Sequence, residues 1–415
     1  MNRIKSITIF MSLIFAFLII PKCQTLGQEK KRNKTLDSVS IINRIHRNLY
    51  KNIKPYQYLF NKYWAVDTFT KDSILRNKPD FIILPIITYA PETNLKFGLA
   101  SAYSFFTHND PITRVSTQTA KISYSLDHQY GIELNPDFWL KGNAYHFTGA
   151  FQYIAFPAYY YGIGSNTLLS NKVLLNSHEF YLNLEAEKTL FTNFRIGLSL
   201  TSVRNNYNFS SNNTFFQKNP NLYALTGGTS FFTGISLIYD SRNRLNYTTQ
   251  GTYIKLNSGI NLNGISNLNT MQQVNFSAVE YIPLSKKSTI GFNIVSNNVF
   301  GKQIPFYLLN QLGGSNIERG YYTGRFRDKS LLAAQAEFKY HIIPRLAFGV
   351  FAGTGTVWGN SIFSFSEFKP SLGGGVRYVF SIPNQLTFRL DYGIGEKPTG
   401  EPRLHGAYFA LSEAF

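Results

Sequence analysis

The chain has 415 residues, of which 44% are apolar, 16% aromatic and only 15% charged, and its formal net charge is +18. The 36 Phe and 27 Tyr residues exclude a disordered chain, and a single cysteine, Cys23, excludes a disulfide-stapled fold. A mean hydropathy of −0.14, with one long apolar run near the start, argues against helical membrane spans. The remaining classes are a large soluble β protein and a transmembrane β-barrel.

Residues 1–27 have the pattern of a signal peptide. Arg3 and Lys5 precede a 14-residue apolar run that is too short to span a bilayer, and Thr25 and Gly27 are small enough for the signal-peptidase pockets. We therefore expect export and cleavage after Gly27. The alternative is a lipoprotein with its lipid on Cys23, where the preceding Pro and Lys are unfavourable.

Residues 28–80 form a basic extension that we expect to lie in the periplasm. Residues 28–79 contain twelve basic and four acidic side chains, which is +8 of the total charge. In an exported chain this charge suits anionic lipid head groups or an acidic partner rather than nucleic acid, and a solvated tail is the alternative. Apolar residues recur at helical spacing from Ile41 to Ile53, so we expect a short amphipathic helix that ends at Pro55.

From residue 81 to 415 the dominant pattern is alternation of apolar and polar residues, as at 120–127, 180–187, 334–341 and 387–394. Each such segment predicts a strand with one apolar and one polar face. A soluble sandwich has the same alternation. Apolar faces rich in Phe and Tyr, and the final aromatic Phe415, favour an antiparallel transmembrane barrel. At about 21 residues per strand with its connection, this region accommodates ~16 strands.

Five strings in the body of the chain together resemble one family. They are PIITYAPETNLKFG (Pro85 to Gly98), YYYGIGSN (Tyr159 to Asn166), YDSRNRLNYTTQGTY (Tyr239 to Tyr253), LGGSNIERGYYTGRFRD (Leu312 to Asp328) and GGGVRYVFSIPNQLTFRLDYGIG (Gly373 to Gly395). In this order they are similar to the BamA/TamA-like outer-membrane assembly barrels, also called the bacterial surface antigen family. The resemblance covers residues 81–415 and implies an all-β barrel of 16 strands.

The resemblance also implies a weak lateral seam between the first and last strands and a long extracellular loop folded into the lumen. The family's loop tip matches Arg319, Gly320 and Tyr321, and its acidic residue on the following strand matches Glu337. A buried guanidinium needs a carboxylate partner, so we expect Arg319 to pair with Glu337. The family's next strand usually reads F-x-D-x-G, but Gly353 replaces the Asp here.

Asp391 lies in the polar phase of a later strand, so we treat it as a candidate second anchor for Arg319. Asp240, Arg242 and Gly251 match a turn string of the family. We interpret them as a turn that Asp240 caps and Arg242 braces, with a transport role as the alternative.

Two features point to the seam. Pro85 cannot donate to a β ladder, so its strand belongs at an edge, although Pro85 could equally mark the start of the strand. Phe415 shares the lipid-facing phase of the last strand with Phe409 and Leu411, and Glu413 interrupts that phase, so we expect Glu413 at the interfacial rim.

The sequence contains no nucleophile elbow, no paired metal-binding histidines and no phosphate-binding glycine loop, and its seven His are scattered. We therefore predict no enzyme activity, no metal and no cofactor. A phospholipase whose Ser and His converge only in the fold is the alternative.

We expect an outer-membrane protein of a Gram-negative bacterium that helps to insert or translocate protein or lipid through its seam. Its expected partners are outer-membrane lipids, with nascent outer-membrane proteins or a periplasmic partner as alternatives for a protein partner, and we expect no nucleic acid. The extension is too short for the periplasmic repeat modules of the larger family members, so the chain resembles the short members that lack them. The alternative function is a passive pore or a structural barrel.

Overall fold

The computed structural model describes residues 79–415 with gaps at 91–93, 111, 156–157, 209–221, 246, 344, 361–362, 382–385 and 411–412. The predicted signal peptide and nearly all of the predicted basic extension, including its helix, lie outside the described residues. Within the described ranges, no helix has the length and apolar character needed to cross a bilayer.

One antiparallel sheet of seventeen strands contains almost all regular structure of the described residues, and one of its members, β6, has only three residues, so sixteen long strands remain. Expressed in chain order, the strands are β1 (Asp80–Ala90), β2 (Asn94–Phe105), β3 (Ser116–Ser125), β4 (Tyr130–Trp139), β5 (Tyr145–Ala155), β6 (Ala158–Tyr160), β7 (Val173–Phe191), β8 (Phe194–Asn208), β9 (Gly227–Asp240), β10 (Gly251–Asn261), β11 (Gln272–Pro283), β12 (Ser288–Phe300), β15 (Ser330–Ile343), β16 (Leu346–Trp358), β17 (Lys369–Ser381), β18 (Leu386–Ile394) and β19 (His405–Ala410).

A separate two-stranded sheet, β13 (Asn310–Leu312) with β14 (Phe326–Asp328), lies in the long connection between β12 and β15. Within the described ranges, four single-turn 3-10 helices occur in connections: η3 (Lys141–Asn143), η4 (Leu169–Asn171), η5 (Phe306–Leu308) and η6 (Phe365–Glu367).

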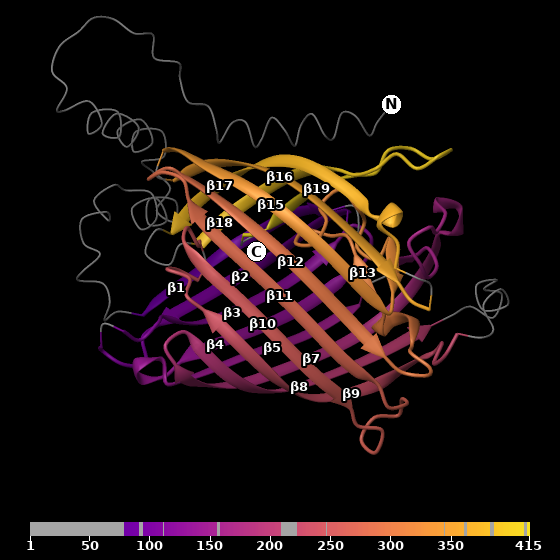
Figure 1. Cartoon of the computed structure of the whole chain (residues 1–415), viewed down its shortest axis with the longest axis horizontal. Helices are drawn as coiled ribbons and strands as arrows, with labels where there is room; N and C mark the ends of the chain where they lie inside the picture. The colour runs from indigo at the N-terminus through magenta and orange to yellow at the C-terminus, as the bar shows by residue number, and fades with distance from the viewer. Residues whose placement is uncertain are drawn as a thin grey trace, which may run out of the picture. The chain divides into compact units, whose positions relative to one another are not determined.

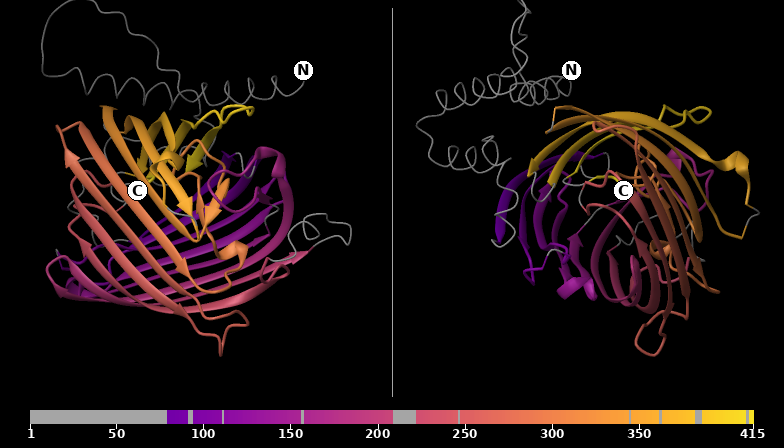
Figure 2. Two further views of the ribbon diagram at one scale, coloured as in Figure 1. Left: turned by 45° about the vertical axis from the view of Figure 1, so that its right-hand side comes forward. Right: turned by 60° about the vertical axis from the view of Figure 1, so that its left-hand side comes forward.

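Each long strand pairs with the next along the chain, and the sheet curls into a barrel of tilted strands (Figures 1 and 2). The all-β, 16-stranded architecture predicted from the sequence is confirmed. Short turns, such as the one from Phe191 to Phe194, join strands at one end of the barrel, and the longest connections, such as the one between β12 and β15, leave the other end. We call these the short-turn end and the long-loop end.

The two faces of the sheet differ as the alternation predicts. On β15, the side chains of Gln335, Glu337 and Lys339 are buried inside the barrel, whereas Phe338 faces outward. Large apolar side chains are exposed on the outer face of many strands, as Leu198 and Ile235 are on neighbouring strands. An apolar exterior around a polar interior is the arrangement of a membrane barrel and not of a soluble sandwich, whose apolar faces pack together.

The first and last strands meet without a ladder. β1 pairs with β2 along its whole length, and β19 pairs with β18 over only six residues. Cα atoms of β1 and β19 approach within 8 Å, but among the described residues no paired register joins these two strands. Pro85 lies within β1, opposite Leu99, as an edge strand allows. Pro85 therefore does not mark the start of the strand.

The end of the chain corrects one prediction. We expected Phe415 on the lipid-facing seam and Glu413 at the rim, but β19 ends at Ala410 and residues 413–415 lie inside the barrel. Phe415 contacts Tyr281 of β11, and Glu413 is paired with Lys339 of β15. The polar interior supplies a cation for Glu413, which a lipid-facing position lacks. Leu411 lies outside the described residues.

The outer face predicts a depth-dependent cost of charge. Leu198, which is 68% exposed on β8, should tolerate Leu198→Ala because lipid replaces the lost contacts. Leu198→Arg should destabilise the folded barrel by about 2–4 kcal/mol if the position lies near the bilayer midplane. Urea unfolding in lipid vesicles measures both changes, and equal stability of the two variants would contradict a lipid-facing Leu198.

Candidate functional site

The connection between β12 and β15 turns back into the lumen. Its two short strands, β13 and β14, pack against the inner wall through an apolar cluster in which Leu312, Tyr321, Phe326, Leu331 and Val357 are buried. Backbone hydrogen bonds from Gly314 to Tyr321 and from Gly324 to Leu312 close the loop on itself. The loop is therefore a folded element held inside the barrel, as the family resemblance implies. We call residues 310–328 the luminal loop.

The predicted tip residue Arg319 is fully buried against the wall. Its Nη2 donates to Glu337 of β15 at 2.6 Å, and its Nη1 donates to Asp391 of β18 at 2.6 Å. The guanidinium also lies 3.5 Å above the ring of Phe351 on β16. The structure thus brings together Arg319 and both carboxylates singled out in the sequence.

A second arginine, Arg377 of β17, completes the arrangement. It donates to Glu337 at 2.7 Å and to Asp391 at 2.5 Å, so each arginine bridges both carboxylates and the four side chains form a closed cycle. Such charge-assisted, bidentate pairing is what a guanidinium needs when it leaves water. Sequence reasoning missed Arg377, although it stands in the polar phase of the quoted GGGVRY string.

Arg389 of β18 extends this cycle toward the loop backbone. It donates to Asp391 at 3.0 Å, to the Ser315 carbonyl at 2.9 Å and to the Asn316 side chain at 3.1 Å. The wall therefore grips the loop through main-chain as well as charged contacts. We call Arg319, Glu337, Arg377, Arg389 and Asp391 the tip ion cluster.

Gly320 and Tyr321 connect the loop tip to the last strand. The Gly320 N–H donates to the Tyr408 hydroxyl of β19 at 3.0 Å, and that hydroxyl donates to the Tyr321 carbonyl at 2.9 Å. Gly320 has a φ of +117°, and a Cβ there would lie 2.9 Å from the Gly395 nitrogen, so only glycine fits. The tip therefore holds the short strand that borders the seam. Tyr408 was not predicted from the sequence.

Tyr321 also fastens the loop to β17. Its hydroxyl donates to the Pro370 carbonyl at 2.7 Å and accepts a hydrogen bond from the Glu396 N–H at 2.9 Å. Its ring is fully buried, as expected for a residue that packs against the wall.

The missing family Asp at Gly353 has two structural replacements. Asp391 supplies the second carboxylate for Arg319, and Glu318 fills the empty space. A Cβ at Gly353 would lie 3.3 Å from Glu318 Oε1. Glu318 is fully buried, and its backbone has a φ of +57°. The Ser371 hydroxyl lies near its carboxyl group, but neither carboxyl oxygen makes a hydrogen bond with normal geometry. Burial raises the pKa of Glu318 to about 8.

The predicted turn residues lie in a second ion cluster at the short-turn end. Asp240 accepts hydrogen bonds from Arg242 Nε at 2.9 Å and from Arg114 at 2.6 Å, and Arg195 lies 3.6 Å away. Asp240 thus ties two connections and the start of β8 together and does more than cap its own turn. Gly251 has a φ of +110°, and a Cβ there would lie 2.4 Å from the Ser241 carbonyl oxygen, so this position requires glycine.

Trp139 packs at the centre of this second cluster. Its ring stacks on His146 with centroids 3.7 Å apart, and the Arg114 and Arg195 guanidinium carbons lie 5.0 Å from it. His146 contacts Glu187 at 2.8 Å, which also pairs with Arg195 at 2.5 Å. The contacts of this second cluster are those of a structural brace that holds the strand ends together, and we assign it that role.

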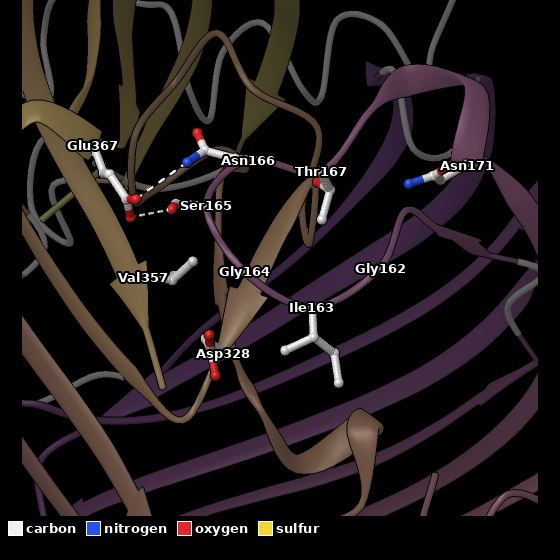
Figure 3. A pocket seen from close by; sticks show the side chains of 10 residues that line it. All are labelled: Gly162, Ile163, Gly164, Ser165, Asn166, Thr167, Asn171, Asp328, Val357 and Glu367. Atoms are coloured by element: carbon white, nitrogen blue, oxygen red, sulfur yellow. Dashed lines mark hydrogen bonds between the residues drawn. The ribbon is translucent and has the colours of Figure 1, made fainter. Parts of the chain in front are cut away.

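A small polar cavity of about 370 Å³ lies at the long-loop end (Figure 3). It lies between residues 162–171, the end of the luminal loop at Asp328, Val357 of β16 and Glu367 of η6. Glu367 accepts hydrogen bonds from Ser165 and, at 3.1 Å, from Asn166. These contacts join neighbouring loops over the lumen. No group of three potential metal ligands occurs in the described part of the chain.

The chain is similar to known proteins in sequence and in fold. The profile of the Omp85 superfamily domain matches residues 113–415. The fold is similar to that of BamA from Haemophilus ducreyi lacking POTRA domains 1–3, with a TM-score of 0.54 and 15% identity over 81% of this chain and 70% of that one. CdiB from Acinetobacter baumannii gives a TM-score of 0.49 and 11% identity over 84% of this chain and 68% of that one. No curated protein matches the chain.

The closed cycle makes Glu337 indispensable to stability. Glu337→Gln leaves Arg319 and Arg377 with Asp391, which Arg389 also contacts, so the free energy of unfolding should fall by about 3 kcal/mol or more. The control is Lys121→Met, which breaks the partly exposed Lys121–Glu133 pair and should cost less than about 1 kcal/mol. Urea unfolding in vesicles compares them, and equal losses would refute the tip ion cluster.

Glu318 predicts a pH dependence. In the folded state its pKa of about 8 exceeds the ordinary value of 4.5, so the folded protein retains a proton that the unfolded chain releases. The stability contributed by Glu318 is complete below about pH 4.5, declines as pH rises and is lost above about pH 8. Glu318→Gln should flatten this decline in the free energy of unfolding. An unchanged pH profile in that variant would contradict a protonated Glu318.

Proposed function

Because this chain belongs to the Omp85 superfamily, whose barrels lie in outer membranes, we propose that it assists the insertion or translocation of protein or lipid through the seam between β1 and β19. The superfamily consists of transport and assembly barrels rather than enzymes. Protein clients and membrane lipid are accordingly the partners that we propose for this chain.

One observation carries the proposal, namely the grip of the luminal loop on β19. Tyr408 hydrogen-bonds the tip on its luminal side, while β19 makes only a six-residue ladder with β18 and none with β1 among the described residues. A seam of this kind is a place where lipid or an incoming strand can enter, because no paired register between β1 and β19 of the described residues has to be broken first. The tip ion cluster keeps the inner side of this seam in position.

The barrel's orientation and the N-terminal segments complete the proposal. The short-turn end faces the periplasm and the long-loop end faces the exterior, as in bacterial outer-membrane barrels. Residues 1–27 act as the signal peptide. Residues 28–80 act as the periplasmic extension, where their basic side chains attract anionic lipid or an acidic partner.

Reconstitution tests the role of the tip at the seam. Liposomes that contain this protein should accelerate the folding of an added unfolded outer-membrane barrel. Tyr408→Phe removes the hydroxyl that bridges Gly320 and Tyr321, and a loss of about 1.4 kcal/mol in the productive geometry would slow client folding about tenfold. The matched control is Tyr392→Phe, on the exposed face of β18.

Passive permeation is the competing outcome. If liposomes with this protein conduct small solutes freely and fold the client no faster than empty liposomes, the assembly role is wrong. The assembly role is equally wrong if depletion of the protein in the cell leaves other barrels and surface lipid unchanged. Equal activity of the two tyrosine variants would instead remove only the role of the tip.

A further inference from the structure

The segment Glu413–Phe415 lies against the inner wall of the barrel at the short-turn end and is not part of a strand. The Tyr281 hydroxyl of β11 donates to the main-chain oxygen of Phe415, and the two rings lie with centroids 6.3 Å apart. On β12, a Cβ at Gly291 would lie 3.0 Å from Phe415 Cε2. The ring thus occupies a depression that the absent side chain of Gly291 leaves open. In Figures 1 and 2 the label of the C-terminus likewise falls within the outline of the barrel.

Glu413 meets two cations of the same wall. Its carboxylate lies 3.4 Å from Lys339 Nζ and 3.9 Å from Arg377 Nε, and its side chain is only 7% exposed. Lys339 in turn lies 4.6 Å from the ring centre of Tyr247 and 5.4 Å from that of Tyr281. A buried carboxylate needs such partners, and a lysine between two aromatic faces is well placed to supply one.

The wall contacts differ in kind from those of a strand. A strand continued beyond Ala410 would place Glu413 and Phe415 on the lipid-facing phase of Phe409, with no cation for the carboxylate. Inside the barrel, Lys339 pairs with the acidic side chain, and the Tyr281 hydroxyl donates a hydrogen bond to the main chain. The depression at Gly291 holds the aromatic ring. These are three specific contacts to a three-residue segment.

We infer that Tyr281, Gly291, Lys339 and Arg377 form a peptide-binding site in the lumen, which the chain's own Glu413–Phe415 occupies as an internal ligand. Its ligand class is a peptide with a carboxylate side chain two residues before an aromatic residue. A tethered segment has an effective concentration in the millimolar range, so a free peptide binds only when the internal segment loses its contacts. This inference does not depend on the proposed function, because the experiment measures binding of a peptide and not the folding of a client protein.

Fluorescence polarisation with a labelled peptide Leu-Ser-Glu-Ala-Phe tests the site on the purified full chain. The double variant Glu413→Ala, Phe415→Ala should bind this peptide, and the wild type should bind it at least about tenfold more weakly. The peptides Leu-Ser-Gln-Ala-Phe and Leu-Ser-Glu-Ala-Ala should each lose about tenfold in affinity, which corresponds to one lost contact of about 1.4 kcal/mol.

The matched control on the wall is Lys255, a second lysine of the lumen that is partly exposed. Adding Lys339→Met to the double variant should abolish peptide binding. Adding Lys255→Met should not, because Lys255 pairs with Glu185. Absence of binding to the double variant, or equal binding by both lysine variants, overturns the site.

A second measurement needs no substitution, in case the double variant fails to fold. A water-soluble carbodiimide joins a carboxylate to an amine in direct contact, so the wild type should yield a Glu413–Lys339 cross-link that mass spectrometry identifies. Failure to find this cross-link, when Lys255–Glu185 is cross-linked in the same sample, would show that the segment does not occupy the site.

Discussion

The closed cycle of Arg319, Glu337, Arg377 and Asp391 is the interaction on which the rest of the lumen depends. A guanidinium transferred from water to a protein interior loses hydration worth several kcal/mol, and attraction to carboxylates offsets this loss only in good geometry. Here each arginine meets both carboxylates at 2.5–2.7 Å. The luminal loop can therefore stay inside the barrel, because the charge at its tip is neutralised there.

The positions of the four residues explain what the cycle holds together. Arg319 belongs to the loop, Glu337 to β15, Arg377 to β17 and Asp391 to β18. The strands that carry the cycle are among the last strands before the seam. Tyr408 adds a hydrogen bond between the loop tip and β19, the strand at the seam. At the short-turn end, Asp240 contacts arginines from two connections and from the start of β8. One ion cluster thus braces strand ends, and the other fastens the luminal loop to the wall.

The seam combines weak pairing with a strong internal hold. β19 has six residues and no described ladder to β1, so backbone hydrogen bonding contributes little there. The hold comes instead from Tyr408 at the tip and from Glu413 and Phe415, which contact side chains of β15 and β11 and the backbone of β12 at Gly291. The last strand is therefore held from inside the barrel as well as by its ladder with β18.

The sequence by itself determined the architecture and the loop-tip residues. Alternation with period two predicted the strands and the polar phase of Glu337, whereas the aromatic-rich apolar faces favoured a barrel and the length of the region gave the strand number. Only the tertiary structure decided the partners. Arg377 lies 40 positions from Glu337, and Tyr408 lies 87 positions from Tyr321, and local patterns carry no signal at that separation. Phe415 was misplaced for the same reason, because strand periodicity cannot tell that the chain leaves the sheet when distant cations and a tyrosine bind it inside the lumen.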